Sequence, residues 1–386
     1  MSELLQVAAA LTRAALEDQV SVLATVVRTE GSTYRRIGAR LVVLGDGSHV
    51  GAVSAGCIES DVLLRVEQVR DTGAAELMTY DSRSPDDLIW GYGTGCGGMT
   101  ELLLEPLDPA QAQAKAERLR TVAESRWPSV LATIIRASGV SVRPGDQAVL
   151  PHAIAKLTGF DEVAAAFRAI IDATARDKLR ARCSAPVHHI WGKQELDIAY
   201  EVRSPRMRVC VCGAGSDAAP LVAMAKLLGW QVTLIDHRPA MLNPGQWPDV
   251  DCLLIRSPAD IAVAVERADC DAAVVMNHHY ERDLEFLAAW LGSAVPFIGM
   301  LGPRHRTQQM ITTLDSNGRV LEGARQRIRS PVGLDLGGET PEEIALSIVA
   351  ELQAVYAGRQ AGFLTRRTNP IHSRPMLASR ESVRGL

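Results

Sequence analysis

The spacing of hydrophobic and polar positions in the first hundred residues predicts an α/β unit. Residues 4–15 carry apolar side chains at helical spacing, which is typical of an amphipathic helix. Residues 22–28 form a β-branched run, and residues 40–44 and 49–54 form two further apolar runs separated by an Asp-Gly pair, which together indicate a strand and a hairpin. A second helix is predicted from about residue 58 to 71.

A different pattern begins near residue 205. Residues 207–212 form a continuous apolar run of the kind found in parallel sheets, and Gly213-Ala214-Gly215-Ser216-Asp217-Ala218 follows at once. A helix to about residue 228 and a strand over 232–235 come next, and that strand ends in Asp236. This order of elements predicts a Rossmann-like parallel sheet at the C-terminal side, beside an N-terminal α/β domain with a mixed sheet.

The segment between these two units resembles a degenerate repeat of the first. Ser21-Val22-Leu23-Ala24-Thr25 reappears as Ser129-Val130-Leu131-Ala132-Thr133, and Thr158-Gly159-Phe160 stands where the first copy has Ala55-Gly56-Cys57. We therefore expect four parts: residues 1–107, a scaffold repeat over 108–204, a Rossmann domain over 205–357 and an Arg-rich tail over 358–386.

Composition narrows the function classes. A net charge of −4 over 386 residues gives no reason to expect nucleic acid or an anionic membrane as a partner. The seven cysteines are scattered and odd in number, which does not suit a disulfide framework. Neither a secretory leader nor a run of membrane-spanning length is expected, so we predict a cytoplasmic protein.

The first candidate site is the small-residue turn from Gly51 to Asp61, which contains Cys57. A thiol at the start of a helix lies near the positive end of the helix dipole, although Glu59 and Asp61 oppose that effect. A buried cysteine in a tight turn is the alternative. The phenylalanine at this place in the second copy favours a functional thiol, because the scaffold forms without it.

A second candidate is the loop from Gly91 to Gly98, which holds Cys96 between Gly95 and Gly97. Five glycines in eight residues let backbone N–H groups converge on an anion, whereas a flexible surface connection is the alternative. The second copy lacks this loop. We predict that Cys57 and Cys96 belong to one site formed by two loops, facing the Rossmann glycines.

The third candidate lies in the Rossmann domain. Gly213, Gly215 and Ala218 suit a close approach of a pyrophosphate to a helix N-terminus, and Asp236 stands where a ribose-binding carboxylate is expected. His278 follows another predicted strand and is a candidate acid–base group or ligand. Arg304 lies at the end of another glycine turn, and its guanidinium group is a candidate to bind a phosphate.

Taken together, these motifs resemble the XdhC/CoxI family of molybdenum-cofactor accessory proteins (xanthine dehydrogenase accessory factor). The resemblance rests on Gly51 to Asp61, Gly91 to Gly98, the glycines from Gly213, residues 276–279, residues 297–304 and residues 333–343. It covers the first and third parts of the chain. Asn277 departs from the threonine expected before His278.

The resemblance implies a chaperone that binds the molybdenum cofactor, protects it during sulfuration, and helps insert it into a xanthine dehydrogenase-type or carbon monoxide dehydrogenase-type enzyme. Cys57 would contact molybdenum, as a soft ligand, and the cofactor would be molybdopterin in its mono- or dinucleotide form. The implied partners are the molybdoenzyme client and a cysteine desulfurase, in a homodimer. The implied cofactor-binding residues are Cys57, Gly56, Glu59, Arg35, Arg36, Cys96, Gly95, Gly97, Gly213, Gly215, Ala218, Asp236, His278 and Arg304.

Two other hypotheses stay open. The Rossmann motif also suits an NAD(P)-dependent oxidoreductase with His278 as its acid–base group, although no substrate-binding constellation accompanies it. A catalytic chain of a dehydrogenase would need the cysteine clusters of iron–sulfur centres, which the sequence lacks. We therefore expect an accessory protein rather than an enzyme.

Overall fold

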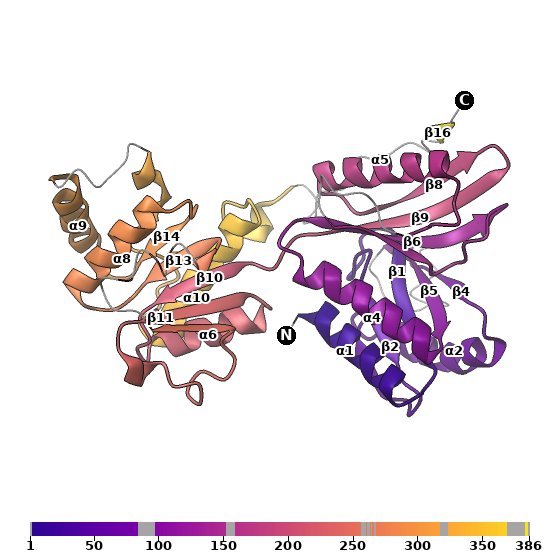
Figure 1. Cartoon of the computed structure of the whole chain (residues 1–386), viewed down its shortest axis with the longest axis horizontal. Helices are drawn as coiled ribbons and strands as arrows, with labels where there is room; N and C mark the ends of the chain where they lie inside the picture. The colour runs from indigo at the N-terminus through magenta and orange to yellow at the C-terminus, as the bar shows by residue number, and fades with distance from the viewer. Residues whose placement is uncertain are drawn as a thin grey trace. The chain divides into compact units, whose positions relative to one another are not determined.

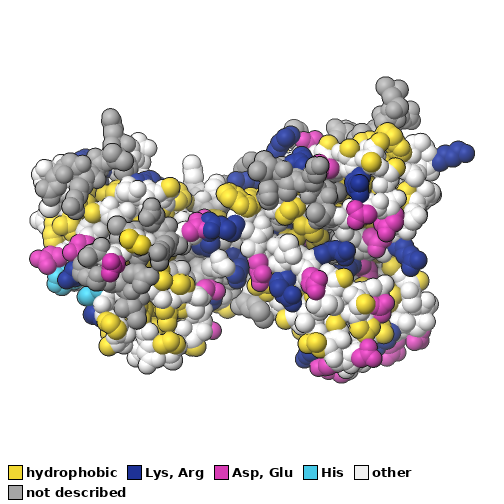
Figure 2. Space-filling view, in the orientation of Figure 1, with side chains coloured by type: hydrophobic (Ala, Val, Ile, Leu, Met, Phe, Trp, Pro, Cys, Tyr) yellow, Lys and Arg dark blue, Asp and Glu magenta, His cyan; other side chains and the backbone are white. Residues whose placement is uncertain are grey.

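The computed structural model describes residues 2–83, 97–151, 159–255, 260, 263, 265, 268–316, 323–368 and 383–384. The chain divides after Pro205 into two compact units (Figure 1). The first unit holds an antiparallel sheet and a second sheet that is antiparallel except for one edge pairing, and the second unit holds a six-stranded parallel sheet. On the face shown in Figure 2, basic and acidic side chains are interspersed over both units.

The first sheet has the order β3-β2-β1-β5-β4. All of its neighbouring strands pair antiparallel. The strands are β1 (Ser21–Gly31), β2 (Arg40–Val43), β3 (His49–Gly51), β4 (Glu76–Asp81) and β5 (Gly98–Leu107).

The second sheet repeats this arrangement. Its order β7-β6-β9-β8 corresponds to β2-β1-β5-β4, and the register shifts at Val26/Arg28 in one sheet and at Ile134/Arg136 in the other. The common order is a property of the fold, and the sequence repeat itself stays a prediction. The strands are β6 (Ser129–Ser138), β7 (Gln147–Leu150), β8 (Ala185–Trp191) and β9 (Gln194–Arg203), with β16 (Val383–Arg384) parallel to β8.

Helices separate and cover these two sheets. Helices α1 (Glu3–Leu16) and α4 (Pro109–Glu124) pack in one core with residues of both sheets. Helix α2 (Glu59–Thr72) covers the other face of the first sheet, and α5 (Ala165–Ala181) covers that of the second. Gly73 ends α2 in a left-handed conformation, which glycine adopts without strain.

Buried charged side chains link the two sheets. Glu201 of β9 accepts from Arg40 of β2 at 2.5 Å. Glu105 of β5 pairs with Lys115 of α4, and the Lys115 ammonium also donates to the Gly145 carbonyl of the second sheet's turn at 2.9 Å. All four side chains are at most 5% exposed. Because an unpaired buried charge is strongly destabilising, these pairs fix how the second sheet sits against the first.

The second unit has the strand order of a dinucleotide-binding sheet, β12-β11-β10-β13-β14-β15, with every pairing parallel. This confirms the predicted Rossmann-like sheet. The strands are β10 (Arg208–Cys212), β11 (Gln231–Asp236), β12 (Cys252–Ile255), β13 (Ala272–Val275), β14 (Ile298–Met300) and β15 (Ile328–Arg329).

Helices cover both faces of the parallel sheet (Figure 1). Helices α6 (Ala218–Leu227) and α10 (Pro341–Tyr356) pack on one face, and α8 (Tyr280–Gly292) and α9 (Arg304–Ser316) pack on the other. The sequence Thr340-Pro341-Glu342-Glu343 forms a capping box at the start of α10, with proline in the first turn. This unit therefore presents the carboxyl ends of its strands at one edge.

Candidate functional site

Cys57 lies in the loop between β3 and α2, and it is exposed. Two glycines shape this loop. A Cβ at Gly51 would lie 2.2 Å from the carbonyl oxygen of Arg40, and both Gly51 and Gly56 have positive φ. The thiol precedes the N-cap residue Ile58, so it stands just outside the helix, and the alternative of a buried core thiol is wrong.

Glu59 holds this loop in place. Its Oε1 accepts hydrogen bonds from the amides of Val53 at 3.2 Å and Ser54 at 2.7 Å, and its Oε2 accepts from the Gly56 amide at 3.1 Å and from the Ser54 hydroxyl. Burial opposes ionisation of Glu59, but the hydrogen bonds from Ser54 and the loop outweigh it and lower the pKa. Glu59 therefore fixes the backbone that carries Cys57.

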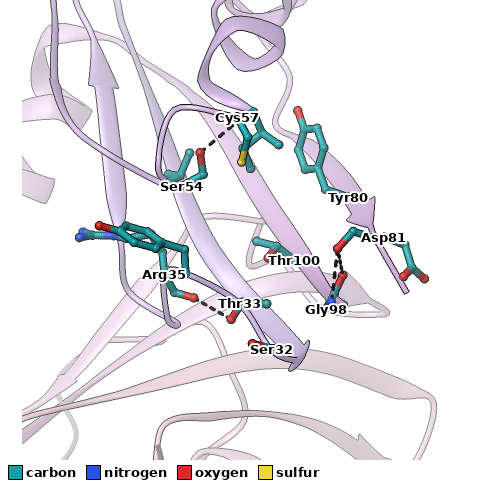
Figure 3. Close-up of a pocket in the computed structure, with 13 residues that line it drawn as sticks. Ser32, Thr33, Arg35, Ser54, Cys57, Tyr80, Asp81, Gly98 and Thr100 are labelled. Atoms are coloured by element: carbon teal, nitrogen blue, oxygen red, sulfur yellow. Dashed lines mark hydrogen bonds between the residues drawn. The ribbon is translucent and has the colours of Figure 1, made fainter. Parts of the chain in front are cut away.

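Cys57 opens onto a small pocket (Figure 3). The sequence missed several lining residues, among them Tyr80 and Thr100. Tyr80 is fixed by its hydroxyl, which donates to Asp61 at 2.7 Å. The cavity volume is about 50 Å³, so it encloses a few atoms of a ligand and leaves a ring system the size of a pterin outside.

The second glycine loop reaches this pocket at its described end. A Cβ at Gly98 would lie 2.1 Å from the carbonyl oxygen of Ser32, and Gly97 has a φ of +64°. Gly95 and Cys96 lie outside the described residues. The pairing of the Cys57 and Cys96 thiols in one site therefore stays a prediction.

The two predicted arginines differ in position. Arg35 lines the pocket and forms an ion pair with Glu3 at the start of α1. Arg36 is exposed and does not line this pocket. The turn that carries both arginines separates the Cys57 pocket from a second, larger cavity.

In the Rossmann unit, the glycine turn has the predicted form. Gly213 follows β10 with a φ of +116°, and a Cβ there would lie 2.6 Å from the carbonyl oxygen of Met276, which follows β13. The Ala218 amide donates to the Gly215 carbonyl as α6 begins. The turn therefore lies between β10 and β13, where the strand order reverses and such sheets bind ligands.

Asp236 is engaged within the protein rather than open to a ribose. It is fully buried, and Oδ2 accepts from the Ala214 amide at 2.7 Å and from the Arg238 guanidinium at 2.8 Å. Burial opposes ionisation, but the hydrogen bonds from Arg238 and Ala214 outweigh it and lower the pKa of Asp236. A ribose hydroxyl would have to displace one of these donors.

His278 lies at the same edge and contacts the glycine turn. Its Nε2 lies 2.6 Å from Oδ2 of Asp217, within the Gly213–Ala218 motif, and its φ is +57°. The sequence did not single out Asp217, because it occupies a position of the glycine motif where any residue type is allowed.

Arg304 is exposed at the start of α9, whereas its neighbour Arg306 pairs with buried Asp283 at 2.7 Å.

Metal-ligand clusters and membrane-spanning helices are both absent from the part of the chain that the structure describes. No group of three or more His, Cys, Asp and Glu side chains gathers there in a way that could hold a metal ion. None of the described helices is long and apolar enough to cross a bilayer.

Comparison with known proteins identifies related chains. Residues 209–352 match the family model of the XdhC Rossmann domain, and residues 14–81 match that of the XdhC and CoxI family. A Bacillus subtilis protein, named as a probable component of xanthine dehydrogenase, is 32% identical over 342 residues, which cover 88% of this chain and 94% of the relative.

Two further relatives extend over most of the chain. The Escherichia coli molybdenum cofactor insertion chaperone PaoD is 24% identical, over 87% of this chain and 83% of its own. A crystal structure from Bacillus halodurans, described as a xanthine dehydrogenase, has a TM-score of 0.70 at 29% identity, over 94% of this chain and 98% of its own. By its matched segments and by the similarity of nearly the whole chain to the Bacillus subtilis relative, this protein belongs to the XdhC and CoxI family.

Proposed function

We propose that this protein binds the molybdenum cofactor and delivers it to a molybdoenzyme of the xanthine dehydrogenase or carbon monoxide dehydrogenase type. The observation that carries the proposal is the exposed Cys57 thiol, held on a rigid loop at a pocket within a segment that matches the family model. The insertion-chaperone relative PaoD supports an accessory role. Protection of the cofactor during sulfuration belongs to the same proposal.

The residues around Cys57 fit such a cofactor in part. A thiol is a soft ligand suited to molybdenum, so Cys57 would hold the metal, and the cavity of about 50 Å³ has room for only a few atoms of the cofactor. Bound there, the cofactor would supply its metal and dithiolene chemistry to the client enzyme. The protein's own residues position the thiol, through the hydrogen bonds of Glu59 and Ser54.

The test is pterin retention after purification from a host that makes the cofactor. Wild type is expected to carry fluorescent pterin, and Cys57→Ala is expected to lose it. Cys252→Ala is the matched control, because Cys252 is also an exposed thiol but lies at the start of β12 in the other unit. Equal pterin occupancy in wild type and Cys57→Ala would overturn the proposal.

The client, the desulfurase and the homodimer are tested separately. We expect a molybdoenzyme client and a cysteine desulfurase to be retained on the immobilised, pterin-loaded chain, and Cys57→Ala to retain less of the client. Light scattering of the purified protein tests the homodimer, and a monomer mass at every concentration would contradict it.

An NAD(P)-dependent oxidoreductase is the second candidate, because Gly213 and Gly215 form a dinucleotide-type turn at the strand-order reversal. The engagement of Asp236 by Arg238 weighs against a preformed ribose site. Titration with NADH and NADPH, followed by cofactor fluorescence, separates the candidates. Tight binding with hydride transfer to a substrate, and no pterin, would favour the oxidoreductase.

A further inference from the structure

A second cavity lies on the other side of the turn that carries Arg35. Its volume is about 290 Å³, several times that of the Cys57 pocket, and it is lined by four arginines: Arg35, Arg36, Arg40 and Arg203. Three of them come from the turn before β2 and from β2 itself, and Arg203 ends β9 in the second sheet. The two sheets of the first unit therefore build this cavity together.

The cavity carries an excess of positive charge. Glu201 forms ion pairs with two of the arginines, at 2.5 Å from Arg40 and 3.5 Å from Arg203. Glu3 pairs with Arg35, and exposed Arg36 forms no ion pair with any residue that the structure describes. Two carboxylates thus face four guanidinium groups, which leaves about two positive charges, close to the charge of a phosphate monoester dianion.

Two arginine donors in the lining are buried and unused. The Nε groups of Arg40 and Arg35 have no hydrogen-bond acceptor, although Arg40 as a whole is only 2% exposed. A buried donor without an acceptor is costly, so the protein's own residues do not fully satisfy these two guanidinium groups. Guanidinium groups match the planar spacing of phosphate oxygens and bind them in pairs.

The corresponding turn of the second sheet has the same backbone form but fewer arginines. A buried glutamate fills the Cβ direction of the turn glycine in both sheets, Glu201 at Gly38 and Glu105 at Gly145. Gln147 stands opposite Thr133 as Arg40 stands opposite Thr25, so the second sheet has an amide in place of that guanidinium. The arginine-lined cavity is thus a feature of one turn and not a consequence of the shared strand order.

We propose that this arginine cavity binds a phosphate monoester or diphosphate group, as the anionic end of the ligand whose other end meets Cys57. Tyr34 and Arg35 line both cavities, so the two cavities are adjacent and lie on either side of one turn. This deepens the proposed function and rests on it for the identity of the ligand. The proposal also gives the second sheet a part in ligand binding, through Arg203.

Calorimetric titration of the full chain with inorganic pyrophosphate and with inorganic phosphate, at matched ionic strength, tests the site. Wild type is expected to bind one pyrophosphate saturably, and Arg36→Gln and Arg203→Gln are each expected to bind about tenfold more weakly, through loss of a charge-assisted contact. The matched control is Arg143→Gln, which removes an exposed arginine from the corresponding turn of the second sheet. Absence of saturable binding by wild type, or equal weakening in the control, would overturn the proposal.

Pterin retention in the same variants identifies the source of the phosphate and separates the two proposals. If Arg36→Gln and Arg203→Gln release pterin and pyrophosphate competes with it, the cofactor supplies the phosphate and both proposals hold. If pyrophosphate binding depends on these arginines but Cys57→Ala keeps its pterin, the phosphate site stands and the proposed function fails. If Cys57→Ala loses pterin while both arginine variants retain it, the proposed function stands and the phosphate site is refuted.

Discussion

Replacing Glu59 by glutamine should loosen the loop that carries Cys57 without altering the rest of the fold. The carboxylate accepts from three backbone amides and one hydroxyl, with two donors on each oxygen. A glutamine side chain keeps one oxygen and turns an NH₂ group toward the other two donors. At least one backbone N–H then has no acceptor. The negative charge that strengthens all four hydrogen bonds is also removed.

The magnitude follows from these contacts. Hydrogen bonds to a charged group contribute about 1.5–3 kcal/mol each, and Glu59 is only half-buried, so the low end applies. Losing two such bonds lowers the free energy of loop opening by about 3 kcal/mol, which corresponds to roughly a hundredfold larger open population. Hydrogen exchange of the amides of residues 53–58 measures this population directly.

The pH dependence adds a second signature. The pKa of Glu59 is lowered in the folded protein, so its stabilisation of the loop is fully present above the ordinary carboxyl value of 4.5 and is lost as the pH falls through the folded value. Loop protection in wild type should therefore decrease below about pH 4.5, and protection in Glu59→Gln should not.

The control is Glu67→Gln, which changes an exposed glutamate on the same helix. It should leave the exchange of residues 53–58 within twofold of wild type. Exchange in Glu59→Gln that also stays within twofold of wild type would refute the role assigned to this carboxylate. We further expect Cys57 in Glu59→Gln to retain less pterin, because a mobile thiol is poorly positioned.

Three further variants test other parts of the structure. Lys115→Met should lower the unfolding free energy by about 3–5 kcal/mol at neutral pH, because it leaves the Glu105 carboxylate buried without a partner. Burial already raises the pKa of Glu105, so this loss of stability should shrink as the pH falls toward the ordinary carboxyl pKa. Denaturant titration at several pH values measures the loss and its pH dependence. Asp236→Ala should speed amide exchange of Ala214 by roughly tenfold or more, since that buried N–H loses its acceptor, and unchanged exchange would contradict the assignment. Gly51→Ala should reduce the melting temperature of the first unit, because a Cβ would lie 2.2 Å from a carbonyl oxygen and φ is +91°; an unchanged calorimetric transition would refute that interpretation.

Local sequence patterns predicted the elements well. The apolar run before Gly213, the glycine turn and the strand ending at Asp236 occur as predicted, because each depends on neighbours within a few residues. The capping box at Thr340 is likewise a local device, in which one side chain bonds a backbone amide three residues away. The antiparallel pairing of the first sheet depends on which strands meet, and the sequence did not decide it.

The sequence predicted individual residues of the candidate site but not which residues they contact. Cys57 and Arg35 were found from residue type and turn composition, and both line one pocket. The roles of Glu59 and Asp236 were not predictable, because a carboxylate in a motif resembles a ligand until its hydrogen-bond donors are placed. Both carboxylates are engaged by the protein's own backbone.

The sequence by itself determined the elements, the Rossmann turn, the candidate thiol and the family resemblance, since these depend on local spacing and residue type. Tertiary structure decided which charges meet. Glu201 comes from 161 residues beyond Arg40 to pair with it, and Arg203 completes a cavity that begins in the turn at Arg35. Such contacts are set by the packing of one sheet against another, which brings together side chains whose separation along the chain carries no periodic signal.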